Sequence, residues 1–236
     1  MKTRFAWFVL GLLLLIVFVL TFMKSPDAIA ALLTTVSRDL SGYSVFTHVL
    51  FTLVLATGLL FRGIRSILFS LWIAFLSLSA AIVSIIYVII PNMIVFMMFF
   101  VLIIRAYRAK QLNFSFEKSS SVEVILGSLA LVFGYWYLHW VEAPIWVNAI
   151  LYSPLGVVNC PTMITTCGFL ILGERPRSAH LEAAVGLITL YFGFFGLFRL
   201  GASVDIILIL CAAFLLMRLV SDVARDALLK ESVVTK

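Results

Sequence analysis

The sequence has very few charged residues. Asp, Glu, Lys and Arg together make up 12% of its 236 residues, whereas a soluble globular domain has about 25%. A chain with so little charge cannot cover a water-facing surface of its own. This composition excludes an ordinary soluble domain and favours a chain whose surface lies in lipid, so the bilayer is its first predicted partner.

Cysteine is also scarce, and its three residues, Cys160, Cys167 and Cys211, all lie inside apolar runs. An odd number of thiols at membrane depth argues against a disulfide framework. Cys160 and Cys167 are nearly two helical turns apart with no third ligand close in sequence, so we predict no metal site. The chain also lacks a phosphate-binding Walker loop, a GxSxG nucleophile elbow and an HExxH zinc motif. We therefore predict no cofactor and no enzymatic activity.

Apolar residues are abundant. They make up 64% of the chain, 21 of them are Phe, and the mean hydropathy is +1.18. Apolar runs about as long as a membrane-crossing helix, ~20 residues, recur from one end of the chain to the other. We predict a single all-α domain over residues 1–236, a polytopic transmembrane bundle of about eight spans at residues 5–23, 43–61, 67–89, 93–104, 122–141, 147–173, 181–198 and 204–220. The more polar stretch 24–42 is expected to form a short helix at the membrane surface.

The positive charges indicate how the predicted bundle is oriented. If the N-terminus lies in the cytoplasm, all but three of the 17 Lys and Arg residues fall in cytoplasmic segments, the exceptions being Lys24, Arg38 and Arg199. Such a bias is typical of cytoplasmic loops, so we predict that both termini are cytoplasmic and that the protein lies in a plasma (inner) membrane. The net charge of +6 comes from these short clusters rather than from a basic stripe, so we expect no nucleic-acid partner.

The predicted sixth span is interrupted by helix-breaking residues around Pro154–Pro161. Pro154, Gly156 and Pro161 fall close together, and a proline inside a helix removes a backbone hydrogen bond. Backbone groups freed at membrane depth must be satisfied by protein or by water in a cavity. The segment is therefore either a proline-kinked packing helix or the lining of a substrate site, as broken helices are in many transporters.

A helix that restarts at Pro161 would place that proline in its first turn, where proline is tolerated. Asn159 or Cys160 is then expected to cap the helix. Asn159, Thr162 and Thr166 are spaced by three and four residues, so they would share one face of it. These five residues are the candidate substrate path.

Four further polar residues lie near the predicted outer ends of spans five, seven and eight: His139, Glu142, Arg199 and Asp205. Charged groups at membrane depth are costly and often functional. They are either interfacial charges within an aromatic belt or an outward-facing polar vestibule in which Arg199 pairs with Asp205 or Glu142. The belt would consist of Tyr135, Trp136, Tyr137, Trp140 and Trp146.

Three motifs in the second half of the chain resemble a known family. They are Cys160-Pro-Thr162, Gly168-Phe-Leu-Ile-Leu172, and Gly193-Phe-Phe-Gly-Leu-Phe-Arg-Leu-Gly201 followed by Asp205. Their order and spacing resemble the bacterial multi-span membrane proteins grouped as domain of unknown function 6064, over about a quarter of the chain. The resemblance implies a multi-span membrane fold, sometimes labelled a transporter permease, and it directs attention to Cys160-Pro161-Thr162 and Asp205.

The leading hypothesis is a small-molecule or ion permease whose path passes the broken sixth span, beneath the outer polar residues. The alternative is a non-catalytic membrane subunit or scaffold that binds protein or lipid partners. The third is an intramembrane enzyme, which we disfavour because no acid–base or metal constellation is visible in the sequence. The expected partners are the bilayer, a small molecule or ion, and a membrane protein.

Overall fold

The structure is a computed structural model that describes residues 2–117, 119–137, 139–140 and 150–234. Within these residues the fold is all-helical, as predicted. In chain order the helices are α1 (Lys2–Phe22), α2 (Pro26–Asp39), α3 (Ser41–Leu60), α4 (Arg65–Ile86), α5 (Ile90–Arg108), α6 (Ser121–Tyr135), α8 (Asn159–Leu172), α9 (Ala179–Arg199) and α10 (Ile206–Val234), with short 3-10 turns η1 (Arg62–Ile64) before α4 and η2 (Ser203–Asp205) before α10.

Several of these helices are suited to a bilayer. In the described part of the chain, α3, α4 with its preceding turn, α5, α9 and the first part of α10 with η2 are each long and apolar enough to cross a membrane. The bent pair α1 and α2 provides a sixth helix of this kind if the two count as one span. Helices α6 and α8 are apolar but shorter, at 15 and 14 residues. The fold is therefore a helical membrane bundle.

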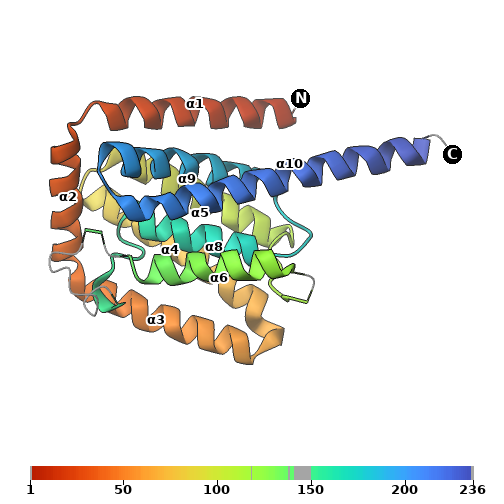
Figure 1. Cartoon of the computed structure of the whole chain (residues 1–236), viewed down its shortest axis with the longest axis horizontal. Helices are drawn as coiled ribbons and strands as arrows, with labels where there is room; N and C mark the ends of the chain where they lie inside the picture. The colour runs from red at the N-terminus through yellow and green to blue at the C-terminus, as the bar shows by residue number, and fades with distance from the viewer. Residues whose placement is uncertain (1, 118, 138, 141–149, 235–236) are drawn as a thin grey trace.

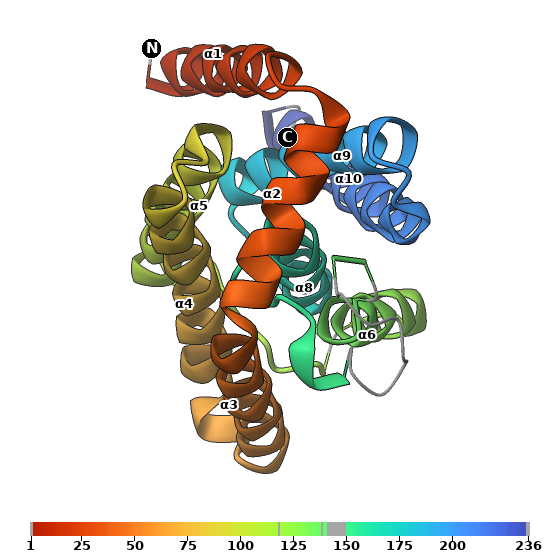
Figure 2. The ribbon, with the colours of Figure 1, turned by 90° about the vertical axis from the view of Figure 1, so that its left-hand side faces the viewer.

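The long helices run roughly along one axis, whereas α2 lies across one end of them (Figure 1). The chain turns by 97° between α1 and α2. At that corner the Ser25 side chain accepts a hydrogen bond from the Ala28 N–H, and Pro26 occupies the first turn of α2, which is a favourable start for a helix. Seen from this end, α2 crosses in front of the bundle (Figure 2), and both chain termini lie at the opposite end (Figure 1).

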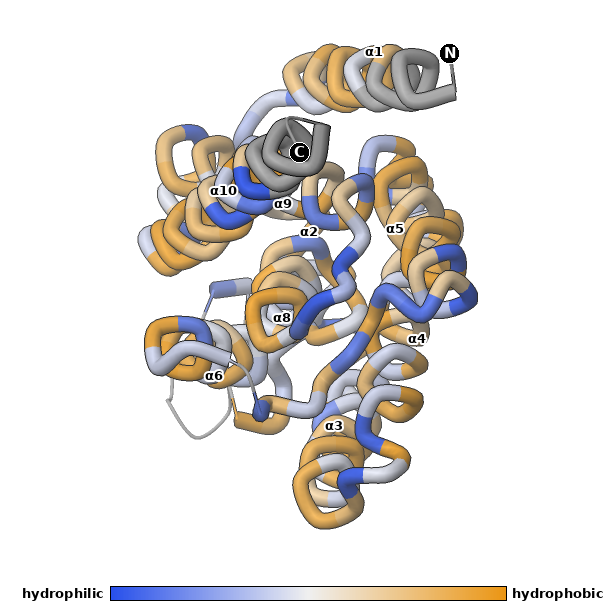
Figure 3. Tube along the Cα trace, turned by 90° about the vertical axis from the view of Figure 1, so that its right-hand side faces the viewer, coloured by the Kyte–Doolittle hydropathy of each residue, from blue (hydrophilic) through white to orange (hydrophobic). Residues whose placement is uncertain are grey.

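The outer surface of the bundle is apolar. Side chains such as Leu60 and Phe198 are about three-quarters exposed, an arrangement that water would penalise and lipid accepts. Hydrophobic residues line the outer helices and hydrophilic residues gather in the connections between them (Figure 3). This distribution fits a protein whose sides face hydrocarbon and whose two ends face water.

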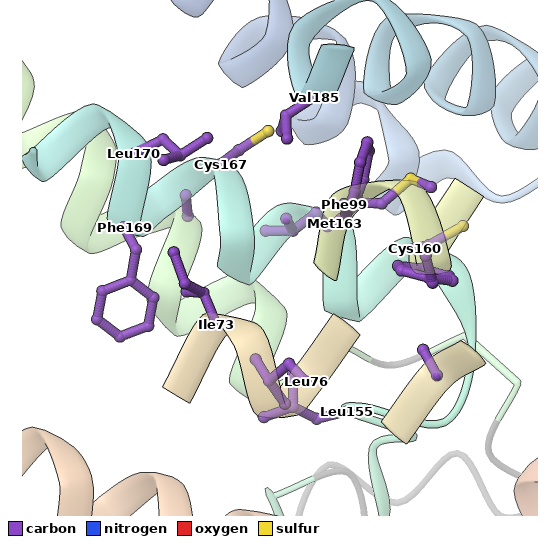
Figure 4. Close-up of a cluster of buried hydrophobic side chains, with 14 of the residues drawn as sticks. Ile73, Leu76, Phe99, Leu155, Cys160, Met163, Cys167, Phe169, Leu170 and Val185 are labelled. Carbon is purple, nitrogen blue, oxygen red and sulfur yellow. The ribbon is translucent and has the colours of Figure 1, made fainter. Parts of the chain in front are cut away.

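Helix α8 is the centre of the bundle, and all 14 of its residues are buried. It packs closely against α6 through glycines, because a Cβ at Gly168 would lie 2.9 Å from the Gly127 carbonyl oxygen and one at Gly134 would overlap the Thr165 hydroxyl. Small residues allow such close helix contacts in membranes. On its other sides, apolar side chains from neighbouring helices, including Phe99 and Val185, surround α8 (Figure 4).

Candidate functional site

The interruption predicted in the sixth segment is present in the structure. Residues 153–158 are not helical, and α8 begins only at Asn159. Gly156 has a φ of +73°, in the left-handed region that glycine adopts without a steric penalty. The prolines and this glycine therefore produce a tight, irregular entry into the central helix.

Hydrogen bonds from neighbouring helices satisfy the backbone of this entry segment. The Gly156 carbonyl accepts from the Ser79 hydroxyl at 2.6 Å, and its N–H donates to the Thr162 hydroxyl at 2.9 Å. The Leu155 carbonyl accepts from the Thr47 hydroxyl at 3.1 Å. Because protein groups take up these bonds, the irregular backbone is fixed in place with these polar groups satisfied.

The predicted cap of α8 was wrong. The N-cap residue is Val158 and no side chain caps it, whereas Asn159 and Cys160 are already helical. Because the helix begins at Asn159, the N-cap position falls on Val158, whose side chain has no hydrogen-bond acceptor. The Thr162 hydroxyl instead donates to the Val158 carbonyl at 2.7 Å and accepts from the Gly156 N–H. Pro161 lies in the first turn, as predicted, and is buried with the rest of α8.

Thr166 belongs to the interior of α8 rather than to a site. Its hydroxyl donates to the Thr162 carbonyl one turn earlier, at 2.8 Å, and the residue is fully buried. Hydroxyls that bond back to their own helix are common in membrane helices. Of the three residues predicted to share a face, Asn159 is the one among the described residues that lines the cavity beneath α2.

Asp205 is fully buried, and the fold brings two donors to its carboxylate. The Tyr137 hydroxyl donates to one carboxylate oxygen, with Oη 2.5 Å from Oδ1. The Cys160 thiol donates to the other, with Sγ 3.3 Å from Oδ2. Within the described residues no Lys, Arg or His forms an ion pair with Asp205. Two residues of the predicted site, Cys160 and Asp205, are thus in direct contact.

Gly196 in α9 makes room for this carboxylate. A Cβ at Gly196 would overlap Asp205 Oδ2, so any other residue would displace the side chain. The backbone at this point also holds the turn before α10, because the Gly196 carbonyl accepts from the Ala202 N–H at 2.9 Å. The glycine-rich motif in α9 therefore has a local explanation in the burial of Asp205.

A cavity of about 340 Å³ lies beneath α2 at the same end of the bundle. Its wall is mainly apolar and comes from α1, α2, α5 and α9, with residues such as Leu33 and Phe192. Its polar residues are few, and they include Asn92, Asn159 and Lys24. Asn159 thus lines the cavity, while the next residue in the chain contacts the buried Asp205.

The remaining candidates lie elsewhere. The Arg199 guanidinium donates to the Lys24 carbonyl at 3.2 Å and lies 4.3 Å from the centre of the Phe22 ring, so the predicted pairing with Asp205 is not formed. Arg199 instead joins the end of α9 to the link between α1 and α2. The side chain of His139 packs on Trp140, with ring centres 4.3 Å apart.

Glu142 lies outside the described residues, and so does the alternative pairing of Arg199 with it. Among the described residues, two separate features lie at this end of the bundle. One is the cavity beneath α2, and the other is the buried group of Tyr137, Cys160 and Asp205.

Sequence reasoning missed the role of Tyr137, which it assigned only to an aromatic belt. Its partner is 68 residues away in the chain, so no spacing pattern connects the two. It also missed Asn92, which reaches the cavity from the first turn of α5 and is 5% exposed. Asn92 directly follows Pro91 at the end of a predicted span, and this position could have indicated a polar side chain with a specific role.

A second polar group, also missed, lies at the opposite end of α8. Arg218 donates to the Leu170 and Ile171 carbonyls, both at 2.7 Å, and to the Glu182 carboxylate at 2.5 Å. A cation at the last carbonyls of a helix is favourable because of the helix dipole. Arg177 adds an ion pair with Asp222 at 2.6 Å. These contacts fix the far end of α8 to α9 and α10.

Comparison of the chain with family models, with curated proteins and with solved structures gives no match. The function must therefore be argued from the geometry of the bundle itself.

Proposed function

We propose that the protein is a permease for small molecules and that the cavity beneath α2 is its outward-facing binding site. The observation that carries the proposal is that this cavity reaches Asn159, on the first turn of the central helix α8. A discontinuous helix whose N-terminus faces a cavity at one end of the bundle is the arrangement that many transporters use for substrate binding.

The proposed topology has eight spans, with both termini in the cytoplasm of a bacterial cell. The position of α2 across one end supports an interfacial helix on the outer surface, and the two termini at the other end support an even number of spans (Figure 1). The short helices α6 and α8 complete the eight, with the irregular entry segment extending α8. The low charge of the predicted outer segments fits this orientation.

The lining of the cavity indicates the kind of substrate. Most of the wall is apolar, whereas Asn92 and Asn159 carry side-chain amides that can donate and accept hydrogen bonds. Lys24 is the charged residue in the wall, and no carboxylate is among the described lining residues. This lining favours a small, largely apolar molecule with one polar group over an inorganic cation, which would need oxygen ligands of higher charge.

The proposed state is open toward the outside and closed toward the cytoplasm. Below Asn159 the whole of α8 is buried among apolar side chains, and the ion pairs of Arg218 hold its far end. Transport would therefore require α8 and its neighbours to move relative to each other, as in alternating access.

A substitution that fills the cavity tests this function. Leu33→Trp places a larger side chain into the wall, since Leu33 is 3% exposed and lines the cavity. Small amphipathic alcohols, amides and monocarboxylic acids are screened for thermal stabilisation of the purified protein and for uptake by cells. We expect Leu33→Trp to abolish the response to the compounds that act on the wild type.

Leu60→Trp is the matched control, because Leu60 is 75% exposed on the outer surface and lies outside the cavity. The same compounds are expected to act on it as on the wild type. If Leu33→Trp and Leu60→Trp respond alike, or if no compound acts on the wild type, the cavity is not the binding site.

The second candidate is a non-catalytic membrane subunit. It is favoured by α1, whose outward face carries exposed apolar side chains such as Phe8, Leu12 and Leu15, a surface suited to lipid or to a partner helix. A membrane protein that co-purifies at fixed stoichiometry in mild detergent would support this function. The third candidate is an enzyme. It is disfavoured because the Cys160 thiol is buried and donates a hydrogen bond to Asp205 instead of facing the cavity.

A further inference from the structure

The Cys160 thiol has one hydrogen and two acceptors within reach. Its Sγ lies 3.3 Å from Asp205 Oδ2 and 3.7 Å from the side-chain oxygen of Asn159, Oδ1. A thiol donates only one hydrogen bond at a time. The S–H bond therefore points either to the buried carboxylate of Asp205 or to the side-chain amide of Asn159, which lines the cavity.

We propose that Asp205 is a proton-binding site coupled to the cavity, and that Cys160 transmits its protonation state to Asn159. This inference rests on the proposed function, because it treats the cavity as a ligand site. When Asp205 is ionised, the S–H bond points to Oδ2, since a charged acceptor forms the stronger hydrogen bond. The Asn159 oxygen is then free to accept a hydrogen bond from a ligand.

When a proton from water binds to Asp205 Oδ2, the new O–H group donates to the sulfur of Cys160. The thiol keeps its own hydrogen, which turns toward the Asn159 oxygen. One O–H bond of a hydronium ion breaks and releases water, one O–H bond forms on the carboxylate, no S–H bond breaks, and no electrons are transferred. The S–H group of Cys160 and a hydrogen-bond donor of the ligand then compete for the same amide oxygen, so a donor ligand favours the ionised carboxylate.

The surroundings of Asp205 allow its side chain to be either ionised or protonated. Tyr137 donates to its other oxygen, and Gly196 is the residue that α9 places against it. The sequence has no charged residue in α8, none in α9 between Glu182 and Arg199, and none in α10 before Arg218. The carboxylate is thus stabilised by two donated hydrogen bonds, and by the nearby N-terminal turn of α8, without an ion pair among the described residues.

Among the described residues, Arg199 and His139 have partners other than the carboxylate. The Arg199 guanidinium is bonded to the Lys24 carbonyl and lies over Phe22. His139, two residues beyond Tyr137, packs on Trp140. Among the described groups, Tyr137 and Cys160 are therefore the direct contacts of Asp205, and Cys160 alone links it to the cavity wall through Asn159.

Infrared spectroscopy of the full-length protein in lipid nanodiscs tests the proton site without a ligand. The S–H stretch absorbs in a region with few other protein bands, and its frequency reports hydrogen bonding. We expect the Cys160 band to shift with pH while the protein stays folded, to disappear in Cys160→Ala, and to be independent of pH in Asp205→Asn. The Cys167 thiol, which donates to the Thr189 hydroxyl at 3.5 Å, serves as an internal reference that does not shift.

A Cys160 band that is constant over the whole pH range in the folded wild type would overturn the proposal, even if the variants fail to fold. A shift that persists in folded Asp205→Asn would assign the proton to another group and would overturn it as well.

Coupling to the cavity is tested by adding 1-hexanol, a neutral apolar probe with one hydrogen-bond donor. At a pH where both states are populated, we expect 1-hexanol to shift the Cys160 band toward its high-pH position in the wild type and Leu60→Trp, but not in Leu33→Trp. If the Cys160 band shifts with pH but does not shift when 1-hexanol binds, the coupling is overturned, whereas the proposed function of the cavity is not. Failure of 1-hexanol and the compound panel to bind at all would instead contradict the proposed function.

Discussion

At the scale of residues, the burial of Asp205 brings together residues from four parts of the chain. Tyr137 follows α6, Cys160 lies in the first turn of α8, Gly196 lies in α9, and Asp205 itself ends η2. A buried carboxylate is costly unless it is hydrogen-bonded. The hydrogen bonds from Tyr137 and Cys160 and the space at Gly196 together allow Asp205 to be buried. This dependence is local and can be tested with small changes.

Replacing Gly196 by Ala is expected to destabilise the protein by about 1–3 kcal/mol, the usual cost of overpacking. The physical reason is that the new Cβ would overlap Asp205 Oδ2. Unfolding by denaturant in detergent micelles measures the change. Gly42→Ala is the matched control, since a Cβ there meets nothing within 4 Å. Equal stability of the two variants would contradict the packing described for Asp205.

The Asp205 group also shows why the site was only partly predictable. The cysteine–proline motif and Asp205 stand out in the sequence because polar residues are rare there, but nothing in the spacing joins them to Tyr137. The Arg199–Asp205 pairing was a reasonable expectation from opposite charges close in sequence. It fails because Arg199 contacts Lys24 and Phe22, from an N-terminal helix whose position the sequence does not indicate.

At the scale of elements, α8 is held at both ends by polar contacts and along its length by apolar packing. Its start is fixed by Ser79, Thr47 and Thr162, and its end by Arg218. Proline chemistry predicted the interruption, because Pro161 cannot donate a backbone hydrogen bond. It did not predict the cap, because the helix begins at Asn159, after Val158, whose side chain has no hydrogen-bond acceptor.

Removing Arg218 is expected to cost about 3–5 kcal/mol, because it leaves buried Glu182 without its main partner. Glu182 then retains the ion pair with Arg177 Nε, a longer contact at 3.7 Å. The experiment compares Arg218→Met with Arg225→Met, whose side chain is exposed, by unfolding in detergent micelles. The double variant Arg218→Met with Glu182→Gln should recover part of the loss. No difference between the two single variants would show that the ion pairs do not hold α8.

At the scale of the whole molecule, the all-helical membrane bundle was predictable because apolar runs of spanning length dominate the sequence. The packing of its helices was not, since lipid-facing and buried apolar residues look alike in sequence. Phe198 and Phe192 illustrate this, because they lie in the same helix and one is 76% exposed whereas the other is 3% exposed. The cavity beneath α2 results from such packing, so its position could not be predicted from the sequence.

The proposed topology can be checked by chemical labelling of intact cells. Asp27→Cys in α2 is expected to react with a membrane-impermeant maleimide from outside, and Arg62→Cys only after permeabilisation. Both positions are exposed, and the three native cysteines are buried, so the wild type provides the unlabelled control. The reverse pattern of labelling would contradict the orientation.

The central claim is that the cavity beneath α2 binds small molecules from the outside. Its most direct test is the reaction of Asn92→Cys with a small, charged thiosulfonate reagent added to intact cells, because Asn92 lines the cavity. Ser77→Cys, in the buried interior of α4, is the control. We expect Asn92→Cys to react, compounds from the binding screen to protect it from the reagent, and Ser77→Cys to stay unreactive. Reaction of Asn92→Cys only from the cytoplasmic side, or labelling that no binding compound slows, would contradict it.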